Sequence, residues 1–435
     1  MKPQRRACRI LVFLRDIRID RRPPLRTNEL TRVLGEWEGY QLGTAERFEA
    51  GVKGERAEVW IELHRTGSRP GVCSGCGQTI AAVHEYEERW VRDLPILDAD
   101  THLCVHQRRL ACPTCGPRVE QIAWLDRYAR HTRRMAQSVA RMCQGTTIKK
   151  TAEFYGLSRR TVKRIDKAYL EQMLGPPDLS ALEVIAMDEF AIQKGHRYAT
   201  VIVEPTRKEV LWVGRGRGRD DVRPFFELLG PDGRARLRAV AMDMNGAYEE
   251  EVRAQCPQAE VVFDLFHVVA KYGREVIDRV RVDEAHRLRH DKAARQVVKG
   301  SRWLLLRNPD NLKRDEDHVR LDELLAANRK LATVYILKED LKALWDYRHV
   351  GYAWRFWREW YARAIRSRIE PLKTFARRLK ARIEGVLSHC RWPLHTSLLE
   401  GINNKIKVIK RMAYGYRDDE YFFLKIRQAF PGNGP

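Results

Sequence analysis

The sequence lacks any apolar run near the roughly 18–20 residues that a membrane-spanning helix requires. It also lacks the Gly-Lys-Ser/Thr of a P-loop: the glycine-rich residues 214–219 read Gly-Arg-Gly-Arg-Gly-Arg. We expect this stretch to be a plain loop or a flexible phosphate contact, with no ATP dependence. Residues 10–14 are too short an apolar segment for a signal peptide. These absences exclude membrane proteins and P-loop ATPases and predict a cytoplasmic protein with no membrane partner.

Acidic residues are too few to balance the basic ones. The chain has 81 Lys and Arg against 58 Asp and Glu, a formal charge of +23. Such an excess attracts polyanions and is typical of nucleic-acid-binding proteins. Apolar residues make up 44% of the 435 residues, which excludes a disordered chain and leaves room for two to four domains with real cores.

The nine cysteines are an odd number, and four of them form two CxxC pairs. In a cytosolic protein this arrangement favours a metal site over disulfides. Each pair places two thiolates at a tight turn followed by glycine, so together they predict a tetrahedral structural zinc site. The alternatives are four unrelated thiols, iron in place of zinc, or substitution by His84, His102, His106 or Cys104. The predicted ligands are Cys73, Cys76, Cys112 and Cys115.

A helix-turn-helix is predicted after the second pair. Residues 147–155 form a short helix, Gly156 permits the turn, and Ser158 caps a second helix that begins at Arg159. Basic side chains then project from the second helix, suited to phosphates and guanine edges in the major groove. The alternative is an ordinary helical hairpin. The predicted DNA contacts on this helix are Arg159, Arg160, Lys163 and Arg164.

From residue 184 the pattern changes to strands in the order β-β-β-α-β-α-β, which is that of a ribonuclease H-like sheet. Two apolar strands end in aspartate, one in Asp188 and the other in Asp243. In open α/β sheets functional groups gather at the carboxyl ends of strands, so we expect both aspartates at one site. Glu189 is expected on the opposite face, because side chains alternate along a strand. Salt bridging is the alternative role for these carboxylates.

A last helix begins near residue 396. Apolar residues at three- and four-residue steps predict a buried stripe, with Glu400, Asn404, Lys407 and Arg411 on the neighbouring face. Lys407 and Arg411 are further predicted DNA contacts. Asp188, Asp243 and Glu400 together would hold two Mg²⁺ ions, which prefer carboxylate oxygen and activate water or a 3′-hydroxyl for phosphodiester chemistry. We expect Asp188 to bridge both ions, and Mn²⁺ to be able to substitute.

Between the sheet and this helix nearly everything is predicted to be helical. Aromatic side chains cluster in this region: they either pack inside a helical bundle or stack extruded bases. The cluster comprises Trp345, Tyr347, Tyr352, Trp354, Phe356, Trp357, Trp360 and Tyr361.

The order of CxxCG, CPxCG, helix-turn-helix, MDEF, MDMN, FDLFH and LLEGINNKIK resembles the ISL-three family of insertion-sequence transposases, over about residues 28–430. The resemblance implies a bacterial, nucleoid-associated DDE enzyme. It would bind the terminal inverted repeats of its element as double-stranded DNA, cut at those ends and join them to target DNA. Asp188, Asp243 and Glu400 match the catalytic triad, and Asp264 and His267 match an accessory motif of uncertain role. Synapsis of two ends implies a homodimer or higher oligomer.

The predicted fold class is therefore multidomain α+β. It comprises a basic extension (1–27), a zinc-binding domain (28–118), a helix-turn-helix domain (119–175), the first part of a ribonuclease H-like catalytic domain (180–275), a helical insertion (276–387) and the last catalytic helix (388–430). The main rival function is that of a zinc and helix-turn-helix transcriptional regulator with an inactive nuclease-like domain. An RNA-guided nuclease and a host-domesticated recombination protein also compete with the transposase hypothesis.

Overall fold

The computed structural model describes residues 37–432, apart from 52–55, 194, 196 and 395–396. The chain divides into two units, Met1–Gly175 and Pro176–Pro435. The predicted basic extension, residues 1–27, lies outside the described residues. Among the described residues no helix is long and apolar enough to cross a membrane.

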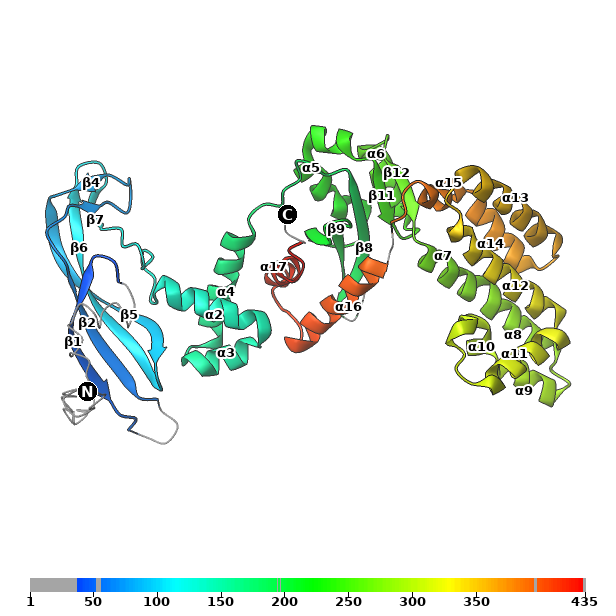
Figure 1. The fold of residues 1–435 in the computed structure, drawn as a ribbon, viewed down its shortest axis with the longest axis horizontal. Coiled ribbons are helices and arrows are strands. Elements are labelled where there is room, and N and C mark those ends of the chain that lie inside the picture. Colours follow the sequence, from blue (N-terminus) through cyan, green and yellow to red (C-terminus); the bar gives the residue numbers. More distant parts are fainter. Residues whose placement is uncertain (1–36, 52–55, 194, 196, 395–396, 433–435) are drawn as a thin grey trace, which may run out of the picture. The chain divides into compact units, whose positions relative to one another are not determined.

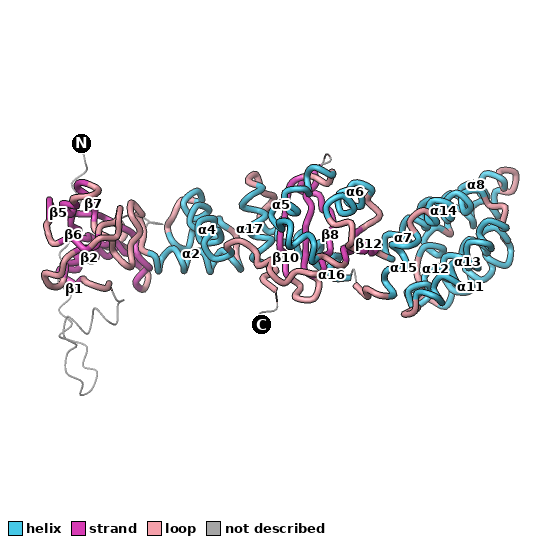
Figure 2. Tube along the Cα trace, turned by 90° about the horizontal axis from the view of Figure 1, so that it is seen from above, coloured by secondary structure: helices cyan, strands magenta, loops and turns pink. Residues whose placement is uncertain are grey.

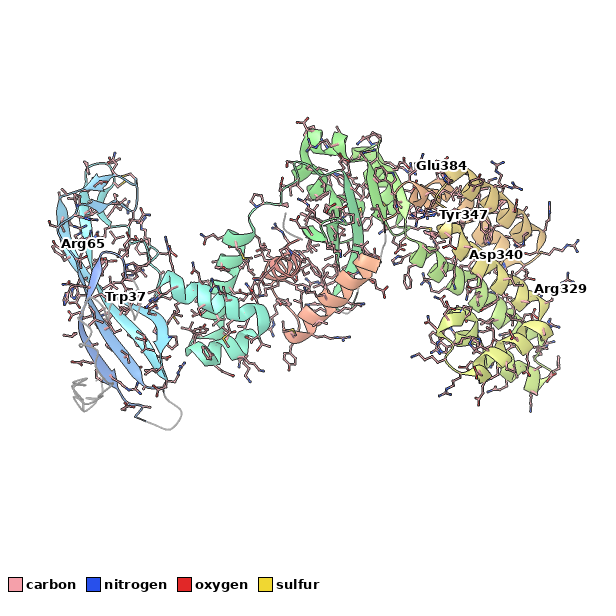
Figure 3. All side chains as sticks on the ribbon, in the orientation of Figure 1. Trp37, Arg65, Arg329, Asp340, Tyr347 and Glu384 are labelled. Carbon is pink, nitrogen blue, oxygen red and sulfur yellow. The ribbon has the colours of Figure 1, made fainter. Side chains whose placement is uncertain are left out.

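The first unit is built on a five-stranded sheet (Figure 1). Its strands run in the order β1-β2-β6-β5, with β7 paired to β6; β2 and β6 are parallel and the other pairs are antiparallel. One face buries a core that includes Trp37, Ile61, Leu63 and Leu103, and Figure 3 labels Trp37. A two-stranded β3-β4 ribbon holds the first CxxC turn. The bounds are β1 Tyr40–Phe48, β2 Glu58–Arg65, β3 Gly71–Val72, β4 Thr79–Ile80, β5 Val83–Ile96, β6 Ala99–Cys112 and β7 Gly116–Val119.

Three helices follow the sheet: α2 (Arg133–Gly145), α3 (Ile148–Tyr155) and α4 (Arg159–Leu174). They share a small core that includes Val139, Ala152, Val162 and Ile165. The first of them begins at Arg133, because Thr132 caps it by accepting a hydrogen bond from the Met135 amide.

A buried carboxylate ties these helices to the sheet. Asp93 on β5 is fully buried. It accepts hydrogen bonds from Trp37 Nε1 at 3.1 Å, Thr132 Oγ1 at 2.6 Å and Arg134 Nε at 2.8 Å. These donors come from both the sheet side and the start of α2, so this one side chain fixes the beginning of α2 against the sheet.

The second unit contains a sheet in the order β10-β9-β8-β11-β12. The first three strands form an antiparallel meander, whereas β8, β11 and β12 are parallel. With α5 (Arg219–Arg236) and α6 (Gly246–Gln255) between strands, the predicted order β-β-β-α-β-α-β is observed. The bounds are β8 Val184–Gln193, β9 Arg197–Glu204, β10 Glu209–Arg215, β11 Ala239–Met242 and β12 Glu260–Phe263.

Each face of this sheet is covered by helices. Phe225, Phe226 and Tyr248 from α5 and α6 pack on the face that carries Met187 and Met242. The opposite face packs against α16 (Ser397–Met412) and α17 (Asp419–Ala429), which contribute Leu399, Ile402, Ile406, Phe422 and Ile426. The predicted apolar stripe of the last helix is therefore buried against the sheet.

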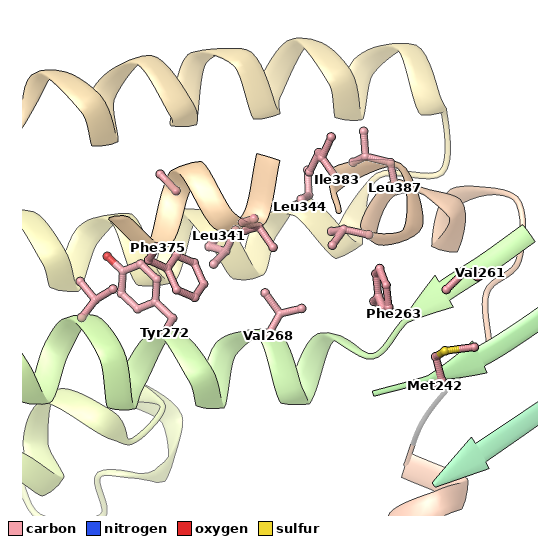
Figure 4. Close-up of a cluster of buried hydrophobic side chains, with 14 of the residues drawn as sticks. Met242, Val261, Phe263, Val268, Tyr272, Leu341, Leu344, Phe375, Ile383 and Leu387 are labelled. Carbon is pink, nitrogen blue, oxygen red and sulfur yellow. The ribbon is translucent and has the colours of Figure 1, made fainter. Parts of the chain in front are cut away.

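The region between β12 and α16 is helical (Figure 2). Its core is continuous with one face of the sheet: Phe263 on β12 lies in the same cluster as Ile383, Leu387 and Tyr272 (Figure 4). Gly385 is needed here, since a Cβ would come within 2.6 Å of the Phe263 ring. The main helices are α7 Leu265–Tyr272, α8 Asp278–Arg287, α9 Lys292–Gly300, α10 Arg302–Leu306, α11 Asp315–Ala327, α12 Arg329–Ala343, α13 Val350–Arg366, α14 Glu370–Lys380 and α15 Ile383–Leu387.

The aromatic cluster of this region mostly packs inside it. Trp357 and Trp360 are 3% and 1% exposed, stack on each other at 5.2 Å, and belong to the core. Tyr352 is 64% exposed. Of the two sequence interpretations, aromatic packing accounts for the buried members of the cluster.

We predict that Asp93→Ala lowers the free energy of unfolding by about 3–5 kcal/mol, because it leaves a buried network without its acceptor. Thermal and denaturant unfolding of the full chain would measure this. The matched control is Asp98→Ala, which removes a carboxylate that is 72% exposed and paired with Arg47; such exposed pairs contribute little. Equal effects of the two substitutions would refute the role given to Asp93.

Candidate catalytic and metal-binding sites

Asp188 and Asp243 come together where the parallel pairing of β8 with β11 ends. Strand β8 continues to Gln193 in its antiparallel pairing with β9, so Asp188 does not end its strand as the sequence predicted. The register pairs Met187 on β8 with Met242 on β11, so the next residue of each chain segment is an aspartate. Asp243 follows the last residue of its strand, and its Oδ1 accepts a hydrogen bond from the Met244 amide. The strand pairing therefore brings together the two carboxylates that the sequence predicts at one site.

Neither of these two carboxylates has a lysine or arginine partner among the described residues. Asp188 is 8% exposed. Burial raises its pKa to about 6; the charges of Glu189 and Asp243 act in the same direction, whereas His267 opposes them. In the part of the chain that the structure describes, no Lys or Arg forms an ion pair with Asp188 or Asp243. The site thus concentrates negative charge in a protein of net charge +23.

Asp264 and His267 lie beside this pair. Asp264 follows β12 and caps α7: its Oδ1 accepts from the Phe266 amide at 2.8 Å, and its Oδ2 lies 2.8 Å from His267 Nδ1. The hydrogen bond to Asp264, with the charges of Asp243 and Asp188, raises the pKa of His267 to about 9. A protonated His267 therefore places a positive charge beside the two aspartates.

The last helix reaches the site through an amide rather than through its carboxylate. Asn403 Nδ2 donates to Asp188 Oδ2 at 2.7 Å, and this contact fixes α16 against β8. Glu400 is one helical turn earlier and exposed to solvent, and no described contact joins it to either aspartate. Lys407 and Arg411 are also exposed. Sequence reasoning named Asn404 on this face and missed Asn403.

Glu189, the neighbour of Asp188 on β8, is electrostatically coupled to the site. The charge of Asp243 contributes to raising its pKa, after burial, and its Oε1 lies 3.6 Å from Arg217 Nη1. Arg217 itself packs over the Tyr198 ring at 4.0 Å. Because Asp243 lies beyond the end of β11, its charge reaches side chains of both faces of β8. The core residues of β8 alternate between its two faces, Met187 in one cluster and Phe190 in the other, so Glu189 is coupled to the site by charge while alternation places it on the face opposite Asp188.

The four predicted zinc ligands form one cluster. Donor atoms of Cys73, Cys76, Cys112 and Cys115 all lie within 4.8 Å of one another. Gly77 and Gly116, which follow the two CxxC turns, have φ of +75° and +70°, as the trailing glycines predicted. None of His84, His102, His106 and Cys104 belongs to this cluster.

Backbone amides favour the thiolate form of one of these cysteines. The amides of Cys76 and Gly75 lower the pKa of Cys73 to about 6, whereas the nearby Cys76 sulfur raises the pKa of Cys115 to about 12. Four thiolates in such proximity require a positive ion between them, which is the donor set of a structural zinc site.

The predicted helix-turn-helix is formed by α3 and α4. Thr147 and Ser158 cap the two helices. Gly156 has φ of +62°, and a Cβ there would lie 2.5 Å from Asp100 Oδ2. Arg159, Arg160 and Arg164 are exposed, whereas Lys163 is half-buried. Arg92 on β5 donates to the Tyr155 carbonyl at 3.1 Å, so the sheet also holds the C-terminal end of α3.

Comparisons with known proteins match three parts of the chain to transposase families. A family model described as a transposase, of the DDE type and the ISL3 family, matches residues 185–426. The helix-turn-helix domain of transposase family ISL3 matches 120–170, and the zinc finger of the IS204/IS1001/IS1096/IS1165 transposases matches 69–115. The transposase for insertion sequence element IS1001 of Bordetella parapertussis is 52% identical over 406 residues, covering 93% of this chain and 98% of the relative. The transposase for IS1557 of Mycobacterium tuberculosis is 26% identical, covering 89% and 92%.

We predict that Cys112→Ser loses the tightly held zinc and much of the folded first unit, because three thiolates cannot complete a tetrahedral site. Elemental analysis after gel filtration would measure the zinc, with circular dichroism to follow folding. Cys390→Ser, a change to a half-buried thiol of the second unit, is the control and should keep its zinc. Full zinc content in the Cys112 variant would contradict the assignment.

Proposed function

The chain belongs to the ISL3 family of insertion-sequence transposases, DNA-processing enzymes with a helix-turn-helix DNA-binding domain, and we propose that it cuts DNA by metal-dependent phosphodiester chemistry at Asp188, Asp243 and Glu400. Its substrate would be the terminal inverted repeats of its own element, and its products would be joined to target DNA. The observation that carries the proposal is the pair of carboxylates, without a Lys or Arg partner among the described residues, at the point where the parallel pairing of β8 with β11 ends.

We infer a ribonuclease H-like fold for the catalytic part. Counted along the chain from β8, the strands are arranged 3-2-1-4-5, with the first three antiparallel and the last two parallel to the first. Helices α8 to α15 then form an insertion before α16. The domain layout that we propose is zinc-binding (28–118), helix-turn-helix (119–175), catalytic (180–275), helical insertion (276–387) and last catalytic helix (388–430).

The donor chemistry of the site fits Mg²⁺, with Mn²⁺ as a substitute. Hard dications take carboxylate oxygens, and the buried Asp188 lacks a basic partner among the described ion pairs. Asp188 and Asp243, with Glu400 from α16, would hold two ions. When bound, such ions activate the attacking water or 3′-hydroxyl and stabilise the leaving oxygen.

The side chains around the triad have positioning roles. Asn403 holds the Asp188 carboxylate by donating to Oδ2, which leaves Oδ1 toward the backbone side, where the Glu189 amide binds it. Asp264 orients His267 and keeps its Nε2 free to face the carboxylates or a substrate phosphate. Glu400 lies on the exposed side of α16, one turn from Asn403, so we expect its side chain to turn toward the aspartates when ions and DNA are bound.

We propose that the helix-turn-helix binds the element ends as double-stranded DNA through Arg159, Arg160, Lys163 and Arg164, and that Lys407 and Arg411 contact DNA near the catalytic helix. The exposed arginines at the start of α4 are suited to phosphates and guanine edges. Because two ends must be held for joining, we expect at least a homodimer on DNA, acting at the nucleoid.

We predict that Asp188→Asn lowers Mg²⁺-dependent cleavage of a labelled duplex carrying the element's own end by a factor on the order of 10³, while DNA binding survives. The same loss is expected for Asp243→Asn and Glu400→Gln. Asp232→Asn, a change of the same chemistry at an exposed position on α5, should retain cleavage. End-specific binding without cleavage by the wild type, under Mg²⁺ or Mn²⁺, would instead favour the transcriptional regulator.

End-specific binding should depend on the basic side chains of α4. Replacing Arg160 and Arg164 by Ala should weaken this binding and reduce the salt dependence of log Kd by about one for each lost phosphate contact. Fluorescence anisotropy at several salt concentrations measures both quantities. Arg355→Ala, at an 80% exposed arginine of α13, is the control. Unchanged affinity and salt slope in the α4 double variant would refute the role of this helix.

A further inference from the structure

A second cluster of metal-ligating side chains lies on the sheet of the first unit, and it shares no residue with the cysteine cluster. Donor atoms of Glu62, His64 and His106 all lie within 4.8 Å of one another. Glu62 and His64 are two residues apart on β2, so they share one face of the strand. His106 lies on β6, whose parallel pairing with β2 joins Leu63 to Val105. That register carries His64 to the level of His106.

Each oxygen of the Glu62 carboxylate faces one imidazole. Oε1 lies 2.8 Å from His106 Nε2, and Oε2 lies 3.5 Å from His64 Nε2. A tetrahedral Zn²⁺ with metal–ligand bonds near 2.05 Å separates two of its ligand atoms by about 3.3 Å. The two observed N···O separations bracket this value. The cluster therefore approaches the spacing of a coordinated ion.

The neighbouring strand is shaped around this cluster. The pairing of β1 with β2 is interrupted between Leu42 and Ala45, and the two residues within this irregularity both serve the cluster. A Cβ on Gly43 would lie 2.5 Å from His64 Cδ2 and 2.6 Å from its Nε2, so only glycine leaves room for the ring. Thr44 Oγ1 donates to Glu62 Oε2 at 2.9 Å. Bulges commonly re-aim side chains in this way next to functional sites.

A further carboxylate lies near the cluster of Glu62, His64 and His106, and the cluster is accessible to solvent. Glu88 on β5 is paired directly opposite His106 and adds a second carboxylate. The side chains of Glu62, His64 and His106 are 32%, 47% and 28% exposed. Two imidazoles and one carboxylate on an open surface leave coordination positions for water, as in the two-His, one-carboxylate sites of d-block metals.

We propose that Glu62, His64 and His106 form a second metal site, which takes a divalent d-block cation such as Zn²⁺ or Co²⁺ with water in the remaining positions. The two imidazole rings are stacked at 5.0 Å with an angle of 15° between their planes. Binding requires modest rotation about their terminal torsions, which are soft in histidine, so that both Nε2 lone pairs converge on the ion beside Glu62. The bound ion would link β2 to β6 and, through Thr44, to β1.

The test is a Co²⁺ titration of the full, tag-free chain that already carries its tightly held zinc. We expect one further equivalent to bind, with a weak visible spectrum and no thiolate-to-cobalt charge transfer, which distinguishes this site from the cysteine cluster. His106→Ala and Glu62→Gln should weaken this binding by at least about tenfold. Gly43→Ala should weaken it as well, because the added Cβ displaces the His64 ring.

His102→Ala is the matched control. His102 lies on the same strand as His106, with its ring centroid 5.3 Å from that of Trp60, but it is not part of the cluster. Its loss should leave the binding of Co²⁺ unchanged. Circular dichroism and zinc content of each variant verify that the first unit is folded. The proposal would be overturned if the zinc-loaded wild type bound no Co²⁺. It would also be overturned if the wild type and the folded Glu62→Gln variant bound Co²⁺ with equal affinity.

Discussion

The constraint on which the second unit depends is the placement of two like charges where the parallel pairing of β8 with β11 ends. Elsewhere in this strongly basic chain, buried carboxylates are paired. Glu120 binds Arg65 and Arg108, Glu251 binds Arg219 and Arg223, and Asp419 binds Arg197 and Arg215. Asp188 and Asp243 have no such partner among the described residues. In a chain with 81 basic residues, two adjacent acids without Lys or Arg partners cost stability. The proposed function, in which they would hold dications, accounts for that cost.

The sheet, α7 and α16 each supply a different side chain to the site around Asp188 and Asp243. The sheet supplies the carboxylates at fixed spacing, because the parallel register is set by the buried apolar residues just before them. Helix α7 supplies His267, oriented by the cap residue Asp264. Helix α16 is packed by Leu399, Ile402 and Ile406 and supplies Asn403. Each functional group thus projects from an element that is fixed by its own apolar face, which is what preorganisation requires.

Much of this could be predicted from the sequence, because the informative patterns are local. An apolar strand that ends in aspartate, a CxxC turn followed by glycine, and a capped helix after a Gly turn each specify their own geometry. The rotation of α16 about its axis relative to the sheet depends on contacts distant in the sequence. The apolar stripe predicts which face of α16 is buried, but not that Asn403 rather than Asn404 contacts Asp188. Likewise, alternation places Glu189 on the face of β8 opposite Asp188 but does not predict that the charge of Asp243 acts on it. The cluster of Glu62, His64 and His106 depends on the parallel pairing of β2 with β6 and on the irregularity at Gly43, neither of which has a signature in the sequence.

The position of Glu400 follows from the same electrostatics. A third carboxylate brought against Asp188 and Asp243 without a compensating ion would add a further like charge to a site where burial and neighbouring charges already raise the pKa of Asp188 to about 6. A neutral amide at the contact point adds no charge, since Asn403 donates a hydrogen bond to Asp188. In the proposed function, Glu400 would join the two aspartates only when bound ions supply positive charge, so that assembly of the triad would be coupled to ion binding.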